Sequence, residues 1–456
     1  MKPTCIISCP IDTFSGYGAR SRDFVRSLIE LKGKEWDIKI LPQKWGETPF
    51  NFLSKDDPLR KLFIPKVENN QQPDIWIMIT IPSEFQRFGR FNIGVTAGIE
   101  TTVYPAEFIE GSNRMDLNLV SSQHSKQVAL ASQFEKIDSN TNQKVGVLKV
   151  EKPVEVLFEG LDLDKYYKKP PSSKLNILKD VKENFCFLFT GHWLPGDFGE
   201  DRKNIATLIK TFLETFKGPG RKKPALILKT SMVNYSLLDK EEVLKRINHI
   251  IKSLNGNLPN IYLLHGEMTD EEMNQLNNDP KVKAFISFTK GEGYGRPLAE
   301  AAITGKPVIT TNWSGHVDFI RPEYNVLIGG QLKQIHGSAA NKWLLKESNW
   351  FEINTEIASK AMKDVFKNYK RYWESSRKQT QYLKDNWSFS KMTEKLNLLL
   401  PKVEAAPKMQ AVNLPKLKKV DSKLPKLQKL NIDSDKETIK WRDTNIKLPK
   451  LQKLKV

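Results

Sequence analysis

The stretch VKAFISFTKGEGYGRPLAEAAITGKPVITTNWSGHVDFI, residues 282–320, decides the fold of this chain. It opens with a strongly apolar run that ends at Phe288, continues through a glycine-rich loop, and reaches Pro297. Proline suits the first position of a helix because the N–H that it lacks would have no partner there. We expect the helix to stop at Gly305 and the next strand to start at Pro307. The segment predicts strand, loop, helix and strand of a parallel α/β sheet.

The glycine loop is also the clearest sign of a binding site. Gly291, Gly293 and Gly295 let a ligand approach the backbone, and the N–H groups and dipole of the following helix favour phosphate. Glu292 and Glu300 stand on either side of this site, with seven residues between them. A carboxylate in a first helical turn is often only a partner of the helix dipole. Across a diphosphate, however, the pair could bind the hydroxyls of a ribose and of a transferred sugar, so a nucleotide-diphosphate sugar fits both ends.

Strand-like runs alternate with amphipathic stretches on both sides of this segment. In the first half they are CIIS near residue 5, IKIL near 38, IWIMIT (75–80), FNIGVT (91–96), LNLVSS (117–122) and VEVLFEG (154–160). In the second half they are FCFLFTG (185–191), ALILKT (225–230), IYLLHG (261–266), VKAFISF (282–288) and KPVITT (306–311). Amphipathic stretches such as 19–31 and 125–134 read as helices. This alternation predicts parallel βα units.

The paired prolines of KKPPSSK (168–174) predict a linker between two such sheets. We therefore expect an α/β protein with two Rossmann-like parallel-sheet domains that face each other across a cleft. Residues 1–172 would form the N-terminal domain, and residues 173–400 the C-terminal, nucleotide-sugar-binding domain. Residues 350–400 read as mostly helical, and the last helices are expected to pack back on the first domain.

Residues 401–456 differ in kind from both domains. They contain the near-identical heptads LPKLKKV (414–420), LPKLQKL (424–430) and LPKLQKL (448–454), and each Leu-Pro pair disfavours a helix. Their 15 basic and 6 acidic side chains give 15 − 6 = +9, about half of the chain's +19. We expect a disordered or extended basic tail. A docking segment for an anionic surface, or for another copy of the chain, is the alternative.

Composition excludes several classes of protein. With 39% hydrophobic residues the chain can bury large cores, so it is not wholly disordered. No run approaches the ~18 apolar residues of a membrane span, and the first ten residues lack the pattern of a cleaved leader, so we expect a cytoplasmic protein. Cys5, Cys9 and Cys186 lie in apolar runs and predict buried, reduced thiols rather than a disulfide framework. Zinc-type cysteine spacings are absent.

The run EGYGRPLAEAAITGKPVI, residues 292–309, resembles the hallmark of the retaining family-4 glycosyltransferases of the GT-B fold, Glu-x7-Glu within an EGFGLPxxEAMAxGxPVI-type run. Other features of that family follow in the expected order: SGYGARSRDF (15–24), NIGVTAGIETTVYP (92–105), LVSSQHSKQV (119–128), VEVLFEGLDLDKY (154–166), FLFTGHW (187–193), RKNI (202–205) and LILKT (226–230). The resemblance covers roughly residues 1–400 and leaves the tail unexplained. It implies that residues 1–172 form the acceptor-side domain.

The resemblance implies roles for particular residues. Glu300 would bind the ribose, and Glu292 would be the catalytic-site carboxylate beside the donor sugar. Arg202 or Lys203, together with Lys229, would clamp the diphosphate and stabilise the charge of the leaving group. The loop backbone would contact the phosphates, and first-domain glycines would lie close to phosphates and acceptor. These donor-binding positions are Gly293, Tyr294, Gly295, Arg296, Pro297, Leu298, Gly16 and Gly18.

The sequence departs from the family pattern in its first domain. Many members carry a histidine near the sugar, but the corresponding run GVTAGIETT has none, and its strand end offers Thr96, Gly98 or Glu100. Glu100 resembles the glutamate of a subgroup that lacks the histidine, and it is our second catalytic candidate. Three histidines have possible roles that the pattern does not decide: His124, which reads as a surface residue, and His192 and His316, either of which could reach the donor.

The reaction that the resemblance implies is transfer of a sugar from a nucleotide-diphosphate sugar to a glycan, lipid or protein acceptor. Retention of anomeric configuration, no metal and no cofactor are part of that expectation. The alternatives are a non-catalytic binding protein that acts through its tail, a nucleotide-sugar epimerase and a phosphorylase. The basic tail and the EFQRFGRF run (84–91) allow peripheral contact with an anionic membrane. Nucleic acid is disfavoured because the tail has one aromatic residue, Trp441.

Overall fold

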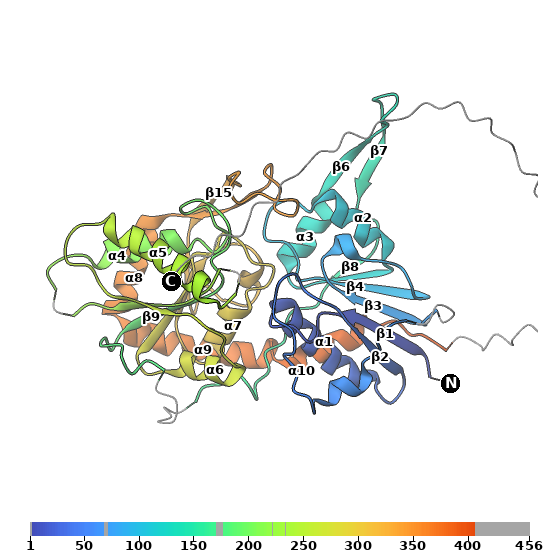
Figure 1. Ribbon diagram of the computed structural model, residues 1–456, viewed down its shortest axis with the longest axis horizontal. Helices are drawn as coiled ribbons and strands as arrows, with labels where there is room; N and C mark the ends of the chain where they lie inside the picture. Colours follow the sequence, from blue (N-terminus) through green and yellow to red (C-terminus); the bar gives the residue numbers. More distant parts are fainter. Residues whose placement is uncertain (1, 68–71, 170–176, 221, 233, 406–456) are drawn as a thin grey trace, which may run out of the picture. The chain divides into compact units, whose positions relative to one another are not determined.

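The structure is a computed structural model that describes residues 2–67, 72–169, 177–220, 222–232 and 234–405 (Figure 1). These residues all belong to one compact unit, Met1–Ala406. The expected domain boundary at 172–173 and the basic tail beyond residue 405 lie outside the described residues.

The first domain is built on a six-stranded parallel sheet with the order β2-β1-β3-β4-β5-β8. Its strands are rich in Ile and Val and are largely buried, as expected for a parallel sheet. Alternate residues face opposite sides of the sheet: Ile75, Ile77 and Ile79 pack in the core beneath α1. The strands are β1 (Thr4–Cys9), β2 (Asp37–Pro42), β3 (Ile75–Ile79), β4 (Phe91–Val95), β5 (Leu117–Val120) and β8 (Val154–Val156).

The second domain contains another six-stranded parallel sheet, with the order β11-β10-β9-β12-β13-β14. Phe187 and Phe189 of its central strand belong to one core cluster, whereas Leu188 belongs to the cluster on the opposite face. The strands are β9 (Cys186–Thr190), β10 (Ala225–Lys229), β11 (Ile261–Leu264), β12 (Val282–Ile286), β13 (Val308–Thr311) and β14 (Val326–Ile328). Two packed parallel sheets with flanking helices confirm the predicted α/β architecture.

Helices cover both faces of the second sheet. Residues of α4, α5 and α8 share the core cluster of Phe187, and residues of α6, α7 and α9 share that of Leu188. The helices are α1 (Gly16–Lys32), α2 (Ala106–Arg114), α3 (Gln123–Ala131), α4 (Ile205–Phe216), α5 (Leu237–Lys252), α6 (Asp270–Asn278), α7 (Arg296–Ile303), α8 (Thr355–Lys367), α9 (Tyr369–Asn386) and α10 (Phe389–Leu399). Short 3-10 turns are η1 (Pro58–Leu62), η2 (Pro82–Glu84) and η3 (Gly315–Asp318).

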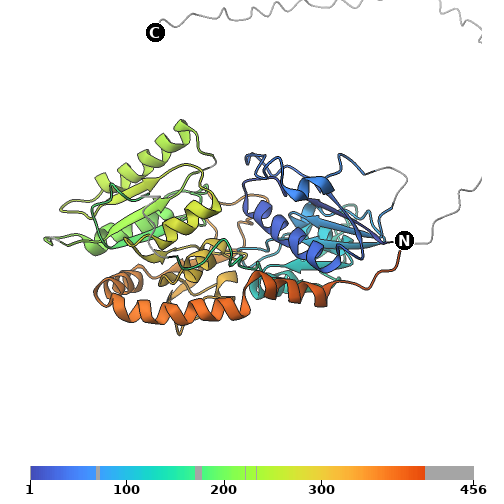
Figure 2. The same cartoon turned by 90° about the horizontal axis from the view of Figure 1, so that it is seen from below.

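The last helix, α10, lies against α1 of the first domain (Figure 2). The Ser27 and Thr393 hydroxyl oxygens are 2.7 Å apart across this contact. The Leu161 N–H donates to the Trp387 carbonyl at 2.9 Å, and the Phe389 N–H donates to the Leu161 carbonyl at 2.8 Å. The chain thus returns from the second sheet to the first.

All the expected strands of the two sheets form, but the regions between them contain more strand than the pattern suggests. The stretch 125–134 does not stay helical to its end, because α3 stops at Ala131 and Phe134 enters the hairpin of β6 (Gln133–Ile137) and β7 (Lys144–Lys149). Trp350, expected in a helical region, lies in β16 (Asn349–Ile353), which pairs with β15 (Gly330–Gln334). Both are antiparallel pairs outside the main sheets.

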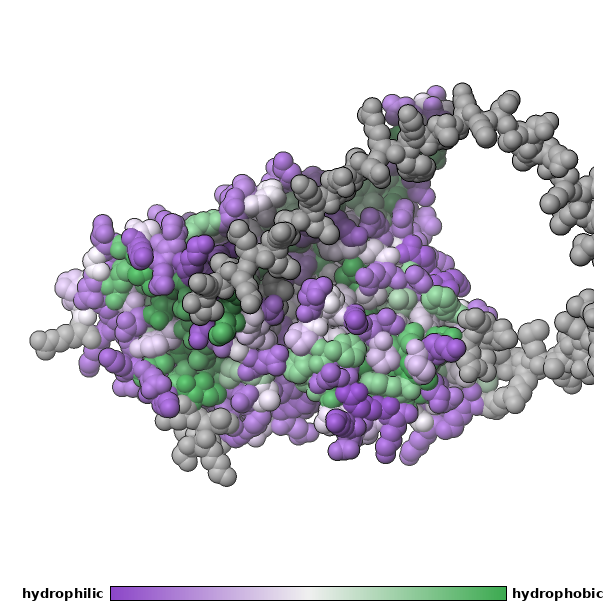
Figure 3. Space-filling view, viewed as in Figure 1, coloured by the Kyte–Doolittle hydropathy of each residue, from purple (hydrophilic) through white to green (hydrophobic). Residues whose placement is uncertain are grey.

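The surface in the view of Figure 3 is mainly hydrophilic, with separate hydrophobic patches. Cys5, Cys9 and Cys186 are buried free thiols, as predicted. Burial raises the pKa of the Cys9 thiol to about 12, so it stays protonated. Among the described residues, no helix combines the length and the apolar composition that crossing a bilayer requires.

Candidate functional site

The glycine loop lies where the strand order of the second sheet reverses. Connections leave β9 toward β10 on one side, while β12 pairs on its other side. In open α/β sheets such a switch point forms a crevice at the carboxyl ends of the strands, where ligands bind. His192 follows β9 and Glu292 follows β12 at this position. The topology therefore places the Glu292 loop at the edge of the sheet where a ligand is expected.

Glu292 is buried, with 6% of its surface exposed, and is held by two cations. Its carboxylate accepts hydrogen bonds from Lys203 Nζ at 2.5 Å and from Arg202 Nη1 at 3.2 Å. Burial alone would raise its pKa, but Lys203 and Arg202 outweigh that effect and lower the pKa to about 2. Its N–H donates to Ser314 Oγ at 2.9 Å. Glu292 is therefore ionised and fixed in position near neutral pH.

Arg202 connects the loop to the first domain. Its Nη1 also donates to the Gly291 carbonyl at 2.8 Å, and its Nη2 is 3.6 Å from a carboxylate oxygen of Glu100, in the loop after β4. The structure thus brings together both predicted catalytic carboxylates and two of the predicted clamp cations. The two positive charges of Arg202 and Lys203 are matched by the two negative charges of Glu100 and Glu292.

Lys229, the third predicted clamp cation, forms its hydrogen bond with a different loop. Its Nζ donates to the Gly266 carbonyl at 2.6 Å and lies 5.0 Å from the ring centroid of Tyr235. Burial lowers the pKa of Lys229, and Glu267 acts in the opposite direction. The structure therefore does not join Lys229 to Arg202 and Lys203 by direct contact.

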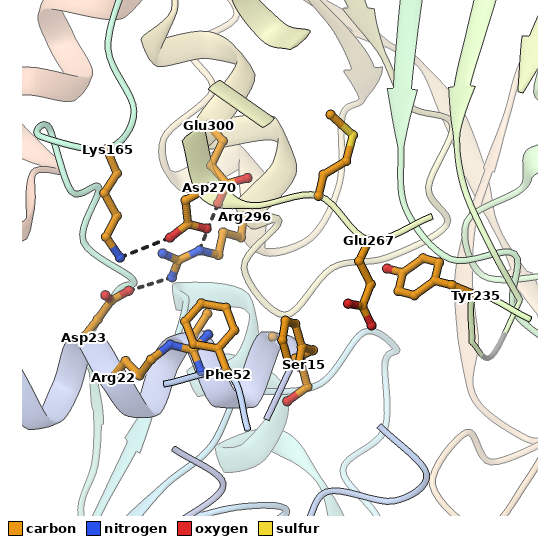
Figure 4. Close-up of a pocket in the computed structure, with 14 residues that line it drawn as sticks. Ser15, Arg22, Asp23, Phe52, Lys165, Tyr235, Glu267, Asp270, Arg296 and Glu300 are labelled. Atoms are coloured by element: carbon orange, nitrogen blue, oxygen red, sulfur yellow. Dashed lines mark hydrogen bonds and ion pairs between the residues drawn. The ribbon is translucent and has the colours of Figure 1, made fainter. Parts of the chain in front are cut away.

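Glu300 lies in α7, 8% exposed, and shares an arginine with the first domain. Arg296 Nε donates to Glu300 at 3.0 Å, and its Nη1 donates to Asp23 of α1 at 2.7 Å and to Glu159 at 3.4 Å. Figure 4 shows the Arg296 guanidinium between the Glu300 and Asp23 carboxylates. Burial raises the pKa of Glu300 to about 7, although Arg296 pulls it down.

A cavity of about 210 Å³ opens beside Glu300 and is lined by both domains (Figure 4). Gly16, Arg22 and Asp23 line it from the first domain. Tyr235, Glu267 and Asp270 are among its second-domain lining residues. Glu292 does not line this cavity, so the two carboxylates of the Glu-x7-Glu pair face different surroundings in this conformation.

The loop glycines have a packing role that the sequence does not reveal. A Cβ at Gly291 would lie 2.0 Å from the Glu100 carbonyl oxygen, and one at Gly293 would lie 2.0 Å from the Ala97 carbonyl oxygen. Ser121 Oγ is 3.0 Å from the Gly293 carbonyl oxygen, to which it donates. We expected these glycines to admit a ligand, but here they admit the backbone of the first domain.

The other predicted loop positions could contact a ligand only through their backbone N–H groups, and some of them not at all. Tyr294 and Leu298 have buried side chains in the hydrophobic core. The Leu298 N–H donates to the Gly295 carbonyl at 3.0 Å, and Pro297 has no N–H. The helix begins at Arg296 after Gly295, whose φ of +100° is left-handed, so Pro297 is second rather than first in the helix. Candidate phosphate donors are thus the N–H groups of residues 293–296.

The first-domain glycines Gly16 and Gly18 begin α1. The Gly18 N–H donates to the helix-capping Ser15 Oγ at 2.9 Å, and a Cβ there would lie 2.3 Å from the Thr13 carbonyl oxygen. Gly18 therefore has a role in forming the turn, and its N–H already has a hydrogen-bond partner. Gly16 has open space around its Cβ position and lines the cavity next to Glu300.

The three histidines differ in burial. His316 is fully buried, its Nε2 donates to the Thr311 carbonyl at 2.7 Å, and its Nδ1 has no hydrogen-bond partner among the described residues. Burial lowers the pKa of His316 and that of His192, whose Nδ1 is 3.1 Å from Ser231 Oγ. His124 is half-buried rather than on the surface, because its ring packs edge-on against that of Trp313, with 4.7 Å between the ring centroids. Burial lowers the pKa of His124 to about 4.

Arg296 and Ser121 make contacts between the domains that the sequence did not reveal. Arg296 stands where the EGFGLP-type pattern has leucine, so a charge at that position was the available signal. Ser121 lies in the LVSSQHSK run but carried no distinguishing pattern. Across the part of the chain that the structure describes, no group of three or more His, Cys, Asp or Glu side chains is placed to hold a metal ion.

No protein-family profile and no curated protein sequence matches this chain. Solved structures do resemble it. HepE from Anabaena, in complex with UDP and glucose, has a TM-score of 0.56 at 12% identity, covering 87% of this chain and 99% of that one. Sucrose-phosphate synthase from Thermosynechococcus elongatus has a TM-score of 0.56 at 11% identity, covering 88% and 98%. A glycosyltransferase from Rickettsia africae has a TM-score of 0.54 at 14% identity, covering 87% and 97%. The chain therefore has the two-domain GT-B fold.

Proposed function

We propose that this protein is a glycosyltransferase that takes a sugar from a nucleotide-diphosphate sugar. The observation that carries the proposal is the buried group of Glu292, Arg202 and Lys203 at the switch point of the second sheet. Glu300 lies one helical turn beyond the same loop, beside a cavity between the domains. Cations, helix N-terminal amides and two carboxylates are the groups that a diphosphate flanked by two sugars requires.

Each group has a task in this proposal. Glu300 binds the ribose hydroxyls, and the N–H groups of residues 293–296 bind the phosphates. Arg202 and Lys203 turn from Glu292 and Glu100 toward the diphosphate as it enters, which stabilises the negative charge of the leaving group. Glu292 then positions the sugar. Glu100 is the first-domain candidate at the reacting centre because Arg202 links it to Glu292.

The finer features of the reaction belong to the same proposal. We expect retention of anomeric configuration and activity without a metal or cofactor, because protein cations and amides neutralise the leaving group. The acceptor is a glycan, lipid or protein. Product NMR reads the anomeric configuration directly, and activity in EDTA equal to that without it supports metal independence. An inverted product, or activity that EDTA abolishes and Mg²⁺ restores, contradicts the corresponding feature.

The first test is binding of candidate donors. HepE was solved with UDP-glucose, so UDP-sugars come first, with GDP- and ADP-sugars as comparisons. Thermal-shift measurements identify the base that stabilises the fold, and liberated nucleoside diphosphate then reports turnover. Stabilisation by one nucleotide series, followed by product formation, supports a transferase. A changed sugar with no acceptor present would indicate an epimerase instead.

Variants test the site. Glu292→Gln and Glu300→Ala are each expected to lower sugar transfer at least about tenfold, since each removes a charged hydrogen-bond partner of the donor. Glu300→Ala should weaken donor binding. Glu292→Gln should lower turnover more than donor affinity. Circular dichroism and melting temperature confirm that both variants fold. Near wild-type transfer by both variants would reject the site assignment.

One observation favours a second candidate, a binding protein without catalysis. Arg202 and Lys203 are already paired with carboxylates, and first-domain backbone packs against Gly291 and Gly293. A protein that had lost its donor site would show these ion pairs and this backbone packing in the place of a ligand. The two candidates separate on donor binding, because the transferase is stabilised by a nucleotide sugar and releases nucleoside diphosphate slowly even without acceptor, whereas the binding protein does neither.

A further inference from the structure

The loop that carries Arg202 and Lys203, residues 191–204, contains neither helix nor strand, although both cations bind Glu292. Contacts with other segments hold this loop. The Asp197 N–H donates to Ser338 Oγ, in the connection between β15 and β16, at 2.9 Å. The Arg202 carbonyl accepts a hydrogen bond from the N–H of residue 290, in the glycine loop, at 2.7 Å. The position of the two cations therefore depends on groups outside their own loop.

Lys290 links this loop to the hairpin β15–β16. Its N–H donates to the Arg202 carbonyl, and its own carbonyl accepts the Phe351 N–H of β16 at 2.9 Å. The Lys290 side chain is fully buried. Its Nζ is 3.5 Å from a carboxylate oxygen of Glu200 and pairs more closely with Glu352 of β16. Lysine is almost never fully buried unless it is paired, so these two carboxylates explain why the charge is tolerated there.

Glu200 completes the link, because it lies in the same loop as Arg202, two residues earlier. Lys333 of β15 donates to Glu200 Oε1 at 2.9 Å, on the carboxylate whose other oxygen faces Lys290. Burial would raise the pKa of Glu200, but Lys333 and Lys290 outweigh that effect and lower the pKa. Two positive charges, Lys290 and Lys333, thus face two negative charges, Glu200 and Glu352.

The hairpin also holds the loop of Glu100. The Thr102 N–H donates to the Asn349 carbonyl at 3.0 Å, and the Asn349 N–H donates to Thr102 Oγ1 at 2.9 Å. The orange segment that follows β15 reaches the first domain in Figure 1, where the Trp343 ring lies 5.0 Å from that of Phe108 between centroids. One hairpin therefore contacts the Glu100 loop, the clamp loop and the glycine loop.

We propose that Lys290 is a positioning residue for the transfer, which fixes the clamp loop against the hairpin through Glu200 and Glu352. The inference rests on the proposed transferase function, in which Lys290 does not itself contact the donor. Arg202 and Lys203 must exchange their carboxylate partners for the diphosphate. Cations stabilise a leaving group best when they are oriented before its charge develops. The buried ion pairs keep the backbone of the clamp loop in place while the two side chains turn.

The first test is hydrogen–deuterium exchange of the full chain without ligand. Lys290→Met keeps the length of the side chain and removes its charge, and Glu352→Gln keeps the shape of its partner. Amides of residues 191–204 should exchange about tenfold faster in Lys290→Met, and by a smaller factor in Glu352→Gln, because the loop opens more often.

Lys281→Met is the matched control. Lys281 immediately precedes β12, the strand after which Lys290 follows, and its Nζ donates to the Leu178 and Val181 carbonyls at 2.9 and 2.6 Å. The variant thus removes a hydrogen-bonded lysine at the opposite end of the same strand. Exchange of residues 191–204 should stay at the wild-type rate in this control, even where its melting temperature falls.

The second test is turnover of the nucleotide sugar that stabilises the chain. In Lys290→Met, kcat should fall about tenfold while KM for the donor changes less than about threefold, because the clamp acts on charge that develops in the transition state. Glu352→Gln should also lower kcat, although it changes the local charge in the opposite direction, which separates positioning from a simple field effect. In the double variant the second substitution should add little, since both act through one ion pair.

The outcomes distinguish this inference from the proposed function. Loop exchange at the wild-type rate in both variants, or wild-type kcat in both, would overturn the inference and leave the transferase standing. Equal effects in Lys281→Met would also overturn it, since loss of any such lysine would then suffice. If Lys290→Met does not fold, Glu352→Gln decides by the same readouts. A wild-type chain that turns over no nucleotide sugar rejects the transferase, and loop exchange then decides alone whether Lys290 positions Arg202.

Discussion

At the scale of the residue, two glutamates of the same loop and helix are held in opposite electrostatic situations. Glu292 faces Lys203 and Arg202, and its pKa is about 2. Glu300 has one cation, Arg296, which it shares with Asp23 and Glu159, and burial raises its pKa to about 7. Of the two carboxylates, Glu300 is therefore the one whose charge changes in the neutral range.

This difference predicts how donor binding depends on pH. If ribose hydroxyls donate to the Glu300 carboxylate, affinity for the donor follows the ionised fraction of Glu300, which is high above its pKa of about 7 and falls below it. Between pH 8 and pH 6 the affinity should fall about tenfold, measured by titration calorimetry with the stabilising nucleotide sugar. Glu292 contributes no change in that range, because its pKa is about 2.

Glu300→Gln is the control for this effect. The amide keeps the shape of the side chain but has no charge to lose, so its weaker donor binding should be flat from pH 6 to pH 8. The groups that face Glu300, namely Arg296, Asp270 and Glu159, are unchanged in this variant. An equal pH dependence in wild type and Glu300→Gln would assign the titration to another group and contradict the prediction.

At the scale of the element, the start of α7 depends on one glycine. Gly295 caps the helix with a φ of +100°, a conformation that costs an L-residue about 1–2 kcal/mol. A Cβ there would also lie 3.0 Å from His316 Cβ and 3.2 Å from Leu298 Cδ1. The helix N-terminus that would face the phosphates is thus set by a backbone shape that only glycine adopts without strain.

Gly295→Ala is expected to lower the free energy of unfolding by about 1–2 kcal/mol through backbone strain alone, and by more if His316 or Leu298 cannot move. Urea unfolding followed by fluorescence measures the change. Gly337→Ala is the control, because Gly337 has open space around its Cβ position and no left-handed φ. Equal stability of Gly295→Ala and Gly337→Ala would show that the cap is not strained.

The elements also show how far sequence reasoning reaches. Strands such as IWIMI and CFLFT were predictable because continuous apolar runs bounded by turn residues are typical of buried parallel strands. The hairpin β6–β7 was not, because Phe134 continues a helical spacing while its packing against the first-domain core draws it into a strand. Tertiary contacts decided that segment.

The candidate site was predictable in its parts but not in its connections. The spacing of Glu292 and Glu300 locates both carboxylates, yet nothing in the sequence pairs Arg296 with Asp23, 273 residues earlier. The same limit applies to Lys229. The family resemblance suggested a clamp of Lys229 with Arg202, whereas in the structure Lys229 Nζ donates a hydrogen bond to the Gly266 carbonyl. Long-range partners of charged side chains depend on how the whole chain folds, both within a domain and between the domains.

At the scale of the whole molecule, Arg296 and Arg202 are both shared between the domains. Arg296 joins α7 to Asp23, and Arg202 joins the Glu292 loop to Glu100. Both arginines contact carboxylates that the proposed donor site uses. Donor binding and the contact between the domains therefore depend on the same charged side chains. A nucleotide sugar that engages Glu300 would compete with Arg296 for that carboxylate.

The basic tail stands apart from this organisation, and its removal is the last prediction. Residues 407–456 carry 14 basic and 5 acidic side chains, 14 − 5 = +9, while the donor-site groups proposed above all lie before residue 401. A truncated chain should end at residue 406 rather than at residue 400. Val403 packs against the core, and the Glu404 carbonyl accepts a hydrogen bond from Arg90 at 3.4 Å.

A chain that ends at residue 406 should therefore keep its melting temperature and its turnover of nucleotide sugar with a small soluble saccharide acceptor. Binding of the full chain to anionic vesicles, if the tail provides it, should weaken with salt and be lost on truncation, since nine net positive charges are removed. A matched variant with the tail's lysines changed to glutamine separates charge from length. Loss of turnover on truncation would contradict the prediction, because it would make residues 407–456 part of the catalytic unit.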